Sequence, residues 1–454
     1  MNLKCGFAWG GWSWLGKCDS NRRIRSGMTW SRTQVTTVRV KQRVQVGMAL
    51  TGTGVGVSDA ISTKDAVDEC IRAVSQSWGV GVAGENSSSV AILTSTCDRD
   101  VDELVQYTKE RLPSGVPIHG LTTCANVLTT TRGAVPGGVG LMLLSGPQGA
   151  FETVALPMNE TQPARAVAKE AAQILRTKLA GRNPGAILMA SHPGDEEQMI
   201  SGIEDVFGQV PVYGGTAADN TVEGNWTILS DSGVFSKGIS LLAIVDGAVR
   251  CGGAIVGPYV KSNLSATITK SEGRRIMELD NRPAADVIRE WMGSDLEEKY
   301  TTGGMVLGET STKPVAVSPS EASPDAMVSI HIAVINKPDR SIDLFREVSN
   351  GQRLHYMMQK GTTAVMSAEI GLVESFEQAK QVASITSPSA GLIIYCGGMG
   401  IAVGDGLSKS LTGQFAEIAS PTPLLGMTCF GEQTFSPALG NHHRNLSVGV
   451  ILFE

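Results

Sequence analysis

The pattern P-x-x-G-x-T occurs three times in this chain, and no other feature of the sequence constrains the fold as strongly. The copies occupy residues 117–122 (PIHGLT), 211–216 (PVYGGT) and 423–428 (PLLGMT). Similar surroundings accompany all three, since an apolar run, a polar turn and a helix-like segment come before each copy and a second apolar run comes after it. The chain is therefore built on an internal repeat, which has to be identified before any local assignment is made.

Each copy is predicted to belong to a strand–helix–strand–strand unit. The first apolar runs are 91–94, 186–189 and 391–394, the helical stretches are 100–112, 196–207 and 408–418, and the second apolar runs are 138–144, 238–245 and 447–453. The helical stretches are long enough for a parallel crossover. Ligands usually bind beside the carboxyl ends of parallel strands, so the turns 95–98, 191–195 and 395–400 and the Gly-Thr runs are predicted to lie at the binding edge.

Length and composition favour an α/β protein of two domains with mixed sheets. The chain has 454 residues, of which 42% are hydrophobic, 18% are charged and 53 are glycine. We expect a first domain over residues 51–247, which carries two repeat units, and a second over 248–454, which carries the third. No apolar run approaches the ~18 residues that a membrane span needs, so membrane insertion is not expected.

The first 50 residues differ in charge from the rest. They contain nine Lys or Arg and a single acidic residue, Asp19, so the net charge of −6 divides into +8 for this leader and −14 beyond it. An Arg-rich leader with Ser and Thr and few acids is typical of a plastid or mitochondrial transit peptide. A disordered tail on a cytoplasmic protein is the alternative. The acidic body would repel phosphate, which argues against nucleic acid as a partner.

Cysteine and histidine patterns give no indication of a metal or cofactor. The eight cysteines form no CxxC pair, and the six beyond the leader lie in or beside apolar runs, so we expect reduced and mostly buried thiols. The adjacent pair His442 and His443 would point apart in a strand. The glycines after Cys396 form neither GxxxxGK[ST] nor GxGxxG.

Several motifs in a fixed order resemble the FIST family, with its paired FIST N and FIST C domains. They are 120–125 (GLTTCA), 214–219 (GGTAAD), 278–284 (ELDNRPA), 395–396 (YC) and 426–432 (GMTCFGE), and the resemblance spans roughly residues 85–454. It implies a sensory or signal-transduction module that binds a small ligand such as an amino acid. It also implies a signalling or ubiquitin-ligase-type protein as partner. Residues 1–50 do not resemble an F-box.

Two positions depart from the family pattern. Asn126 stands in the first repeat where Asp219 and Glu432 keep an acidic residue in the other two, and Met399 stands where an Arg is common. If that Arg contacts an anionic group in relatives, this chain lacks a carboxylate clamp. A strong anion is therefore disfavoured as the ligand.

The predicted ligand site lies where the two domains meet and draws on all three motifs. Its candidate residues are Thr122, Thr123, Gly214, Gly215, Thr216, Asp219, Cys396, Thr428, Cys429 and Glu432. Alternatively, the Gly-Thr runs only form turns at the strand ends, and the acidic residues only cap helices. Cys396 and Cys429 are interpreted as core thiols, because no base stands near them in the sequence.

Two classes of function remain. A non-catalytic sensor is favoured, because no loop carries a nucleophile, a base and a residue to orient the base. The alternative is an enzyme that uses the cysteine loops and His192 for hydrolytic or redox chemistry.

Overall fold

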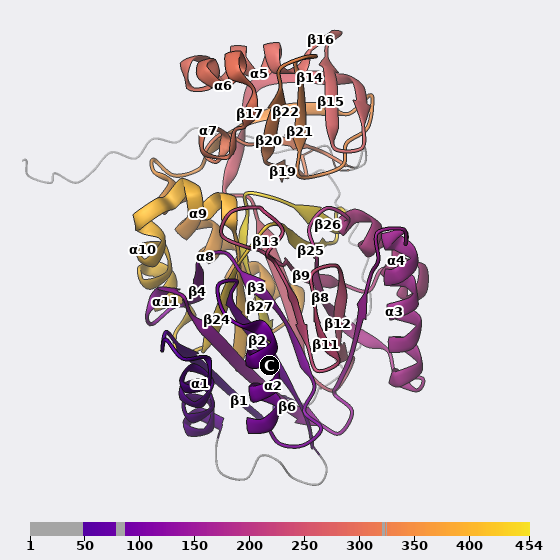
Figure 1. The fold of residues 1–454 in the computed structure, drawn as a ribbon, viewed down its shortest axis with the longest axis vertical. Coiled ribbons are helices and arrows are strands. Elements are labelled where there is room, and N and C mark those ends of the chain that lie inside the picture. The colour runs from indigo at the N-terminus through magenta and orange to yellow at the C-terminus, as the bar shows by residue number, and fades with distance from the viewer. Residues whose placement is uncertain (1–48, 79–86, 320–322, 324) are drawn as a thin grey trace, which may run out of the picture. The chain divides into compact units, whose positions relative to one another are not determined.

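Three units with the same order of elements make up most of the fold (Figure 1). The computed structural model describes residues 49–78, 87–319, 323 and 325–454. Each unit runs strand, helix, strand, helical segment, strand, two-stranded hairpin, strand. This order contains the predicted strand–helix–strand–strand unit and extends it by the leading strand and helix and by the hairpin, so the predicted α/β class with repeated units is confirmed.

The bounds of the elements follow the repeats closely. The first unit comprises β1 (Gly52–Ser58), α1 (Thr63–Trp78), β2 (Ser87–Thr96), α2 (Val101–Arg111), β3 (Ile118–Thr123), β4 (Asn126–Thr129), β5 (Gly133–Pro136) and β6 (Val139–Pro147). The second comprises β7 (Phe151–Pro157), α3 (Ala164–Leu179), β8 (Pro184–Ser191), α4 (Glu196–Phe207), β9 (Val212–Thr216), β10 (Ile228–Ser230), β11 (Gly233–Phe235) and β12 (Gly238–Val245). The third comprises β13 (Cys251–Val256), α8 (Ala364–Val382), β23 (Ala390–Cys396), α9 (Gly397–Val403), α10 (Leu407–Thr412), α11 (Gln414–Ala419), β24 (Leu424–Cys429), β25 (Glu432–Ser436), β26 (Gly440–Arg444) and β27 (Val448–Phe453).

The units exchange their hairpins in a closed cycle. Within each unit the strands are ordered alike, as β1-β6-β2-β3, β7-β12-β8-β9 and β13-β27-β23-β24. The next strand in each sheet belongs to another unit: β10 pairs with β3, β25 pairs with β9, and β4 pairs with β24. Strands on both sides of residue 247 therefore share sheets, and no unit completes its sheet without a neighbour.

The glycine of P-x-x-G-x-T is explained by the approach of the neighbouring parallel strand. A Cβ on Gly120 would lie 1.9 Å from the carbonyl oxygen of Leu93, and one on Gly214 would lie 2.0 Å from that of Met189. The carbonyl of the motif proline accepts a hydrogen bond from the same neighbouring strand in every unit, at 2.9, 2.9 and 3.1 Å. The repeated sequence thus encodes a repeated strand contact.

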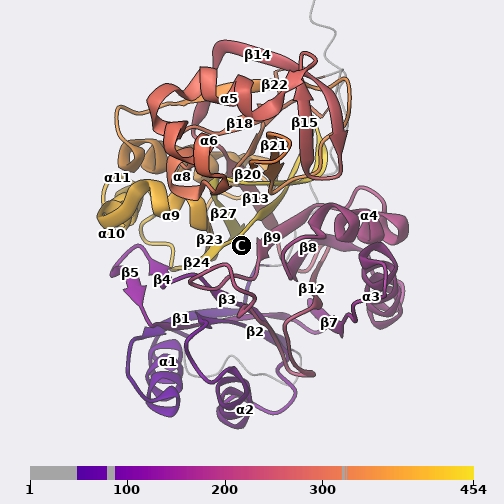
Figure 2. The ribbon, with the colours of Figure 1, turned by 45° about the horizontal axis from the view of Figure 1, so that its top comes forward.

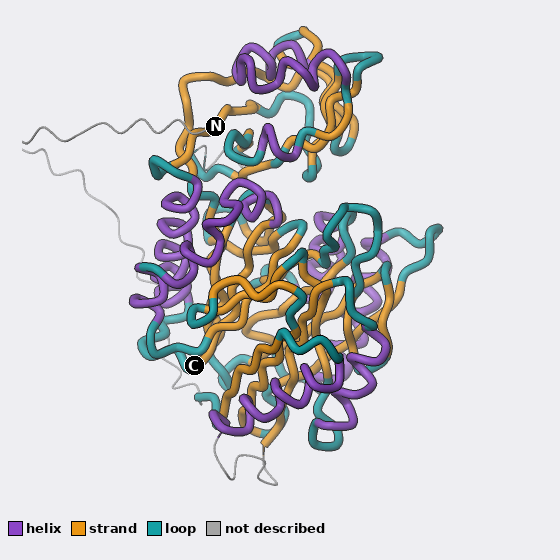
Figure 3. Tube along the Cα trace, turned by 60° about the vertical axis from the view of Figure 1, so that its left-hand side comes forward, coloured by secondary structure: helices purple, strands orange, loops and turns teal. Residues whose placement is uncertain are grey.

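Successive side chains of the central strands point to opposite faces of the sheet, which divides the core into layers. In β2, Val90 and Ile92 face a core that all three sheets share, whereas Ala91 and Leu93 face α1 and α2. Strands β8 and β23 alternate in the same way toward the shared core and toward their own helices. Figure 2 shows α1 and α2 on one side of their sheet, and Figure 3 shows strands gathered between helices. Burial on both faces explains why these strands read as continuous apolar runs.

A separate module is inserted between β13 and α8, and its core is its own. Its elements are β14 (Tyr259–Glu272), β15 (Arg275–Leu279), β16 (Arg282–Pro283), α5 (Ala284–Met292), the 3-10 helix Gly293–Leu296, α6 (Glu297–Thr302), β17 (Gly304–Met305), α7 (Leu307–Thr310), β18 (Val315–Val317), β19 (Val328–Ile330), β20 (Ile332–Asn336), β21 (Ser341–Leu344) and β22 (Arg353–Gln359). The chain enters by β14 and leaves by β22, which pair from Tyr259 and Gln359 onward. Strands β20 and β21 form an antiparallel hairpin around residues 337–340.

Two predictions concern membranes and the leader. Among the described residues, no helix is long and apolar enough to cross a membrane. The predicted transit peptide, with Cys5 and Cys18, lies almost wholly outside the described residues, so targeting stays a prediction.

Candidate ligand-binding site

The three Gly-Thr motifs meet in a cyclic set of backbone hydrogen bonds. In each case the N–H two residues after the motif threonine donates to the threonine carbonyl of another unit. Ala218 donates to Thr122 at 2.9 Å, Phe430 donates to Thr216 at 3.2 Å, and Cys124 donates to the carbonyl of Thr428 at 2.9 Å. The motifs that were grouped from the sequence are therefore brought to one junction.

The motif threonines are buried at this junction, and most of their hydroxyls bond to protein. The Thr122 hydroxyl donates to the carbonyl of Ala218 at 2.9 Å, and the Thr123 hydroxyl donates to the carbonyl of Asn126 at 2.8 Å. The Thr216 hydroxyl donates to Glu196 at 3.1 Å. Thr428 differs, since its buried hydroxyl has no partner among the described residues. The Thr123 and Thr216 hydroxyls also accept from the third unit, from the N–H of Thr428 at 2.6 Å and from Gln433 Nε2 at 2.8 Å, so these side chains chiefly hold the units together.

A cavity of about 120 Å³ lies beside the junction and is lined by all three units and by the inserted module. Cys124, Asp219 and Phe430 come from the loops after the three motifs. The other lining residues are Asn220, Val222, Leu307, His331, Phe345, Cys396, Gly397, Gly398, Ile401 and Asn445. We call this cavity the junction pocket. Its walls are mostly apolar with a few polar groups, as in typical small-molecule sites.

Asp219 shapes one wall of the junction pocket. Its two carboxylate oxygens accept hydrogen bonds from five consecutive backbone N–H groups, those of residues 221–225, at 2.5 to 3.1 Å. Partial burial acts to raise the pKa of Asp219, but these donors outweigh it and the pKa is lowered. The carboxylate therefore fixes the loop that forms the wall, and it can accept few further hydrogen bonds from a ligand.

Cys396 lies in another wall, with Glu432 behind it. The Cys396 Sγ accepts from the N–H of Leu446 at 3.1 Å, and burial raises the pKa of the thiol. Glu432 is fully buried and accepts from the Ser447 hydroxyl, while its Oε1 has no hydrogen-bond partner among the described residues. Burial raises the pKa of Glu432 to about 8, against the effect of Ser447 and Cys396. A carboxyl group thus stands beside the thiol, a neighbour that was not predicted from the sequence.

The raised pKa of Glu432 predicts a pH-dependent stability. The folded protein holds a proton on Glu432 that the unfolded chain releases near its ordinary value of 4.5, so this contribution is complete below 4.5 and is lost as pH rises through about 8. Glu432→Gln should flatten the fall in unfolding free energy between pH 5 and 9, as measured by urea denaturation. Equal slopes for the wild type and the variant would show that Glu432 is ionised at neutral pH.

Two acceptor atoms belong to residues that line the junction pocket, Asn445 and His331. Asn445 is buried; its amide nitrogen contacts His443 Nε2 at 3.0 Å, and its Oδ1 has no partner among the described residues. His331 Nε2 lies 3.1 Å from the carbonyl of Leu307, and burial lowers the His331 pKa to about 4. The neutral ring therefore donates through Nε2 and leaves Nδ1 as an acceptor. This Nδ1 lies toward Gly398, since a Cβ there would come within 2.8 Å of it.

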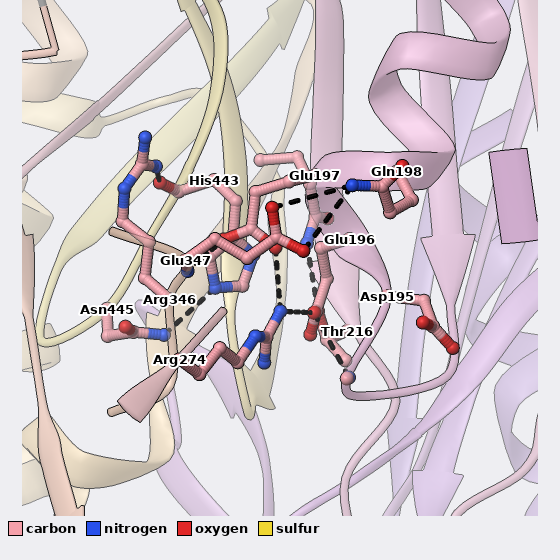
Figure 4. Close-up of polar contacts among 12 residues, drawn as sticks. Asp195, Glu196, Glu197, Gln198, Thr216, Arg274, Arg346, Glu347, His443 and Asn445 are labelled. Atoms are coloured by element: carbon pink, nitrogen blue, oxygen red, sulfur yellow. Dashed lines mark hydrogen bonds and ion pairs between the residues drawn. The ribbon is translucent and has the colours of Figure 1, made fainter. Parts of the chain in front are cut away.

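A buried charged cluster continues from Asn445 toward α4 (Figure 4). Arg274 donates to Glu196 at 2.6 Å and to Glu197 at 2.7 Å, and the side chain of Arg346 donates to the carbonyl of His443. Burial acts to raise the pKa of Glu197, but His443, Arg274 and Arg346 outweigh it and bring it to about 2. Arg274 and Arg346 belong to the inserted module, so the cluster joins this module to the second unit.

The remaining predicted residues lie behind the pocket wall. Gly214 and Gly215 are in β9, where a Cβ on Gly215 would meet the Cys429 sulfur at 2.3 Å. Cys429 is fully buried in β24, as expected of a core thiol. His192, the histidine of the enzyme alternative, is buried, and its Nε2 lies 2.9 Å from Asp195.

Of the ten predicted residues, Asp219 and Cys396 line the junction pocket and the others support it. Cys124 and Phe430 were missed from the sequence, although their position two residues after the motif threonine could have identified them. Asn445, His331 and Phe345 were also missed, because they follow no repeated pattern. Among the described residues, no cluster of His, Cys, Asp or Glu could hold a metal ion.

Comparison with known protein families identifies the family to which the chain belongs. A comparison with curated proteins finds none that matches the chain. The FIST N domain model matches residues 89–282, and the FIST C domain model matches residues 284–434. The two matches together cover most of the chain, and such domains are described as sensory and signal-transduction domains. The chain therefore belongs to the FIST family.

Proposed function

We propose that the protein is a non-catalytic sensor that binds one small metabolite in the junction pocket and transmits its presence to a signalling or ubiquitin-ligase-type protein partner. The observation that carries the proposal is the Asn445 Oδ1, a buried acceptor without a partner among the described residues, in the wall of the cavity. Such an atom usually has a partner in a folded protein, and a ligand N–H would supply it.

The charges of the wall favour a neutral or zwitterionic ligand with N–H donors. Among the described lining residues there is no Lys or Arg, and the Asp219 carboxylate is already bonded to five backbone N–H groups. Asn445 Oδ1 and His331 Nδ1 are both acceptors, which suit an ammonium or amide group. The apolar residues Leu307, Phe345 and Ile401 suit a short aliphatic part. An amino acid or a similar metabolite has this chemistry.

The charged cluster offers a route by which binding can be transmitted. The junction pocket is shared between the repeat units and the inserted module, and Asn445 connects it to His443 and the Arg274 cluster. A ligand that contacts both the repeat units and the inserted module favours the arrangement in which the module is closed over the pocket. This change of population is the signal that a partner would detect.

A pair of glycine variants tests the proposal with the twenty amino acids as probes. An alanine Cβ at Gly397, a wall residue, would find its nearest atoms at 3.4 to 3.6 Å, including the Phe430 ring, so the methyl fits but narrows the cavity. Gly400→Ala is the control, because its Cβ has ample room, at 3.9 Å from Thr428, and Gly400 does not line the pocket. Both glycines lie in α9.

We expect at least one amino acid to raise the melting temperature of the wild type and of Gly400→Ala, by an amount that grows with its concentration. Gly397→Ala should lose this shift and keep its unliganded melting temperature. An equal shift in Gly397→Ala would place the binding site elsewhere. No shift from any of the twenty would exclude amino acids as the ligand class.

The alternative of an enzyme rests on one observation, the buried Glu432 beside the Cys396 thiol. The raised pKa of Cys396 favours the unreactive thiol form, so the sensor is the better-supported proposal.

A further inference from the structure

Two thiols lie at the carboxyl ends of neighbouring parallel strands. Cys97 and Cys124 each follow the last register pair of β2 and β3, which is Thr96 with Thr123. Neighbouring strands lie about 4.8 Å apart, and side chains of a parallel register pair point to the same face. A disulfide requires Cα atoms roughly 4.4–6.8 Å apart. The register therefore places these two cysteines within bridging reach.

A shared neighbour brings the two thiols to the same turn. The side-chain Oδ1 of Asn220 accepts a hydrogen bond from the N–H of Ala125, next to Cys124, at 2.7 Å. The backbone of the same Asn220 also acts to lower the pKa of the Cys97 thiol. Asp219, which precedes Asn220, acts electrostatically on both thiols, and Cys97 acts on Cys124. Both side chains thus face the 219–220 turn, and Cys124 lines the junction pocket.

We propose that Cys97 and Cys124 form a redox-active dithiol, which closes to an intramolecular disulfide in exchange with a small-molecule disulfide such as oxidised glutathione. Cys97 attacks the small disulfide as its thiolate and releases one reduced thiol. Cys124 then loses its proton, attacks the mixed disulfide at the Cys97 sulfur and releases the second thiol. The protein loses two hydrogen atoms, that is, two protons and two electrons, which reduce one small disulfide to two thiols.

The other described cysteines are less suited to exchange. Cys396 and Cys429 also end two neighbouring parallel strands, as the last register pair of β23 and β24, but both are buried, as is Cys70. Cys251 lies in β13. Cys97 and Cys124 are both partly exposed. Burial raises the pKa of Cys97, and it raises that of Cys124 to about 11, so the exchange should be slow at neutral pH and faster as pH rises.

Peptide mapping of the full chain tests the dithiol directly. After equilibration with oxidised glutathione at pH 8 and alkylation of the remaining thiols, trypsin should release Cys97 in the peptide 73–99 and Cys124 in the peptide 112–132. We expect a species in which these two peptides are joined and lighter by two hydrogen atoms. The control variant Cys251→Ser should give the same species. Cys97→Ser should leave Cys124 unlinked. Glutathione adducts on Cys97 without the joined peptides, or Cys124 joined to another cysteine, would overturn the proposal.

A consequence for the junction pocket rests on the proposed function. Because the disulfide draws the Cys124 sulfur toward Cys97, it should reshape the wall and reduce the amino-acid-dependent melting shift in the oxidised wild type, and Cys97→Ser should keep the full shift after the same treatment. Joined peptides together with an unchanged melting shift would support the dithiol but contradict the proposed effect of the disulfide on the pocket. A protein that shows no shift in either state would exclude amino acids as the ligand class of the proposed function, whereas the joined peptides would still decide on the dithiol.

Discussion

Alanine in place of Gly214 should destabilise the protein by about 3 kcal/mol or more, near the upper end of the costs of overpacking. The new Cβ would lie 2.0 Å from the carbonyl oxygen and 2.9 Å from the carbonyl carbon of Met189, both of which are backbone atoms. Neither can rotate away as a flexible side chain would. Gly214 also has a φ of +150°, which residues with a Cβ rarely adopt. The strand pair β8 and β9 would have to separate or shift register.

Urea denaturation of the variant and of a matched control measures this effect. Gly308→Ala adds the same methyl where nothing lies within 4 Å and φ is not positive, so it should change the unfolding free energy by about 1 kcal/mol at most. Similar stabilities for the two variants would show that close approach of the neighbouring strand is not what requires the repeated glycine. Gly120→Ala, with a Cβ 1.9 Å from the carbonyl of Leu93, should behave as Gly214→Ala does.

Replacement of Arg274 by methionine should cost about 3–5 kcal/mol, because it leaves two buried carboxylates without their cation. The Arg274 side chain is 21% exposed, and those of Glu196 and Glu197 are 2% and 16% exposed. Methionine keeps most of the volume, so the loss is chiefly electrostatic. The low pKa of Glu197, about 2, should rise toward its ordinary value of 4.5 in the variant, so less stability should be lost on acidification from pH 4.5 to 2.

The neighbouring residue provides the control for Arg274. Arg275 pairs with Asp343 at 2.6 Å, but its side chain is 47% exposed, so Arg275→Met should cost no more than about 1 kcal/mol. Equal losses in the two variants would show that the buried cluster does not hold the inserted module to the second unit.

The repeats made much of the fold predictable from sequence, because each motif has a local physical cause. The motif glycine is required by an approaching carbonyl at Gly120 and Gly214 and by the approach of the Leu128 side chain at Gly426. The apolar runs are required by burial on both faces, so the local sequence is enough to reveal them. The pairing of each hairpin with the sheet of another unit could not be predicted in this way, because nothing in the sequence of a short hairpin indicates which sheet it joins. The inserted module could not be predicted as a unit, because it has no copy elsewhere in the chain.

Of the residues proposed from the sequence as a ligand site, only Asp219 and Cys396 line the junction pocket. Repetition pointed to the loops after the three motifs, and these loops do meet, but the threonines chiefly hold the units together. The wall is completed by His331 and Phe345 from the inserted module, which approach through the tertiary fold and leave no spacing signal in the sequence. Asp219 was identified as a ligand residue, whereas its five backbone donors show that it chiefly fixes a loop.

Native mass spectrometry of the full chain as purified tests the central proposal, that one small metabolite occupies the junction pocket, most directly. We expect the wild type and Gly400→Ala to carry one small molecule per chain, which is released on denaturation and can be identified by its mass. Gly397→Ala should carry none. The same molecule bound at the same occupancy by Gly397→Ala would contradict the proposed site, and a wild type that neither carries nor takes up any small metabolite would contradict the proposed function.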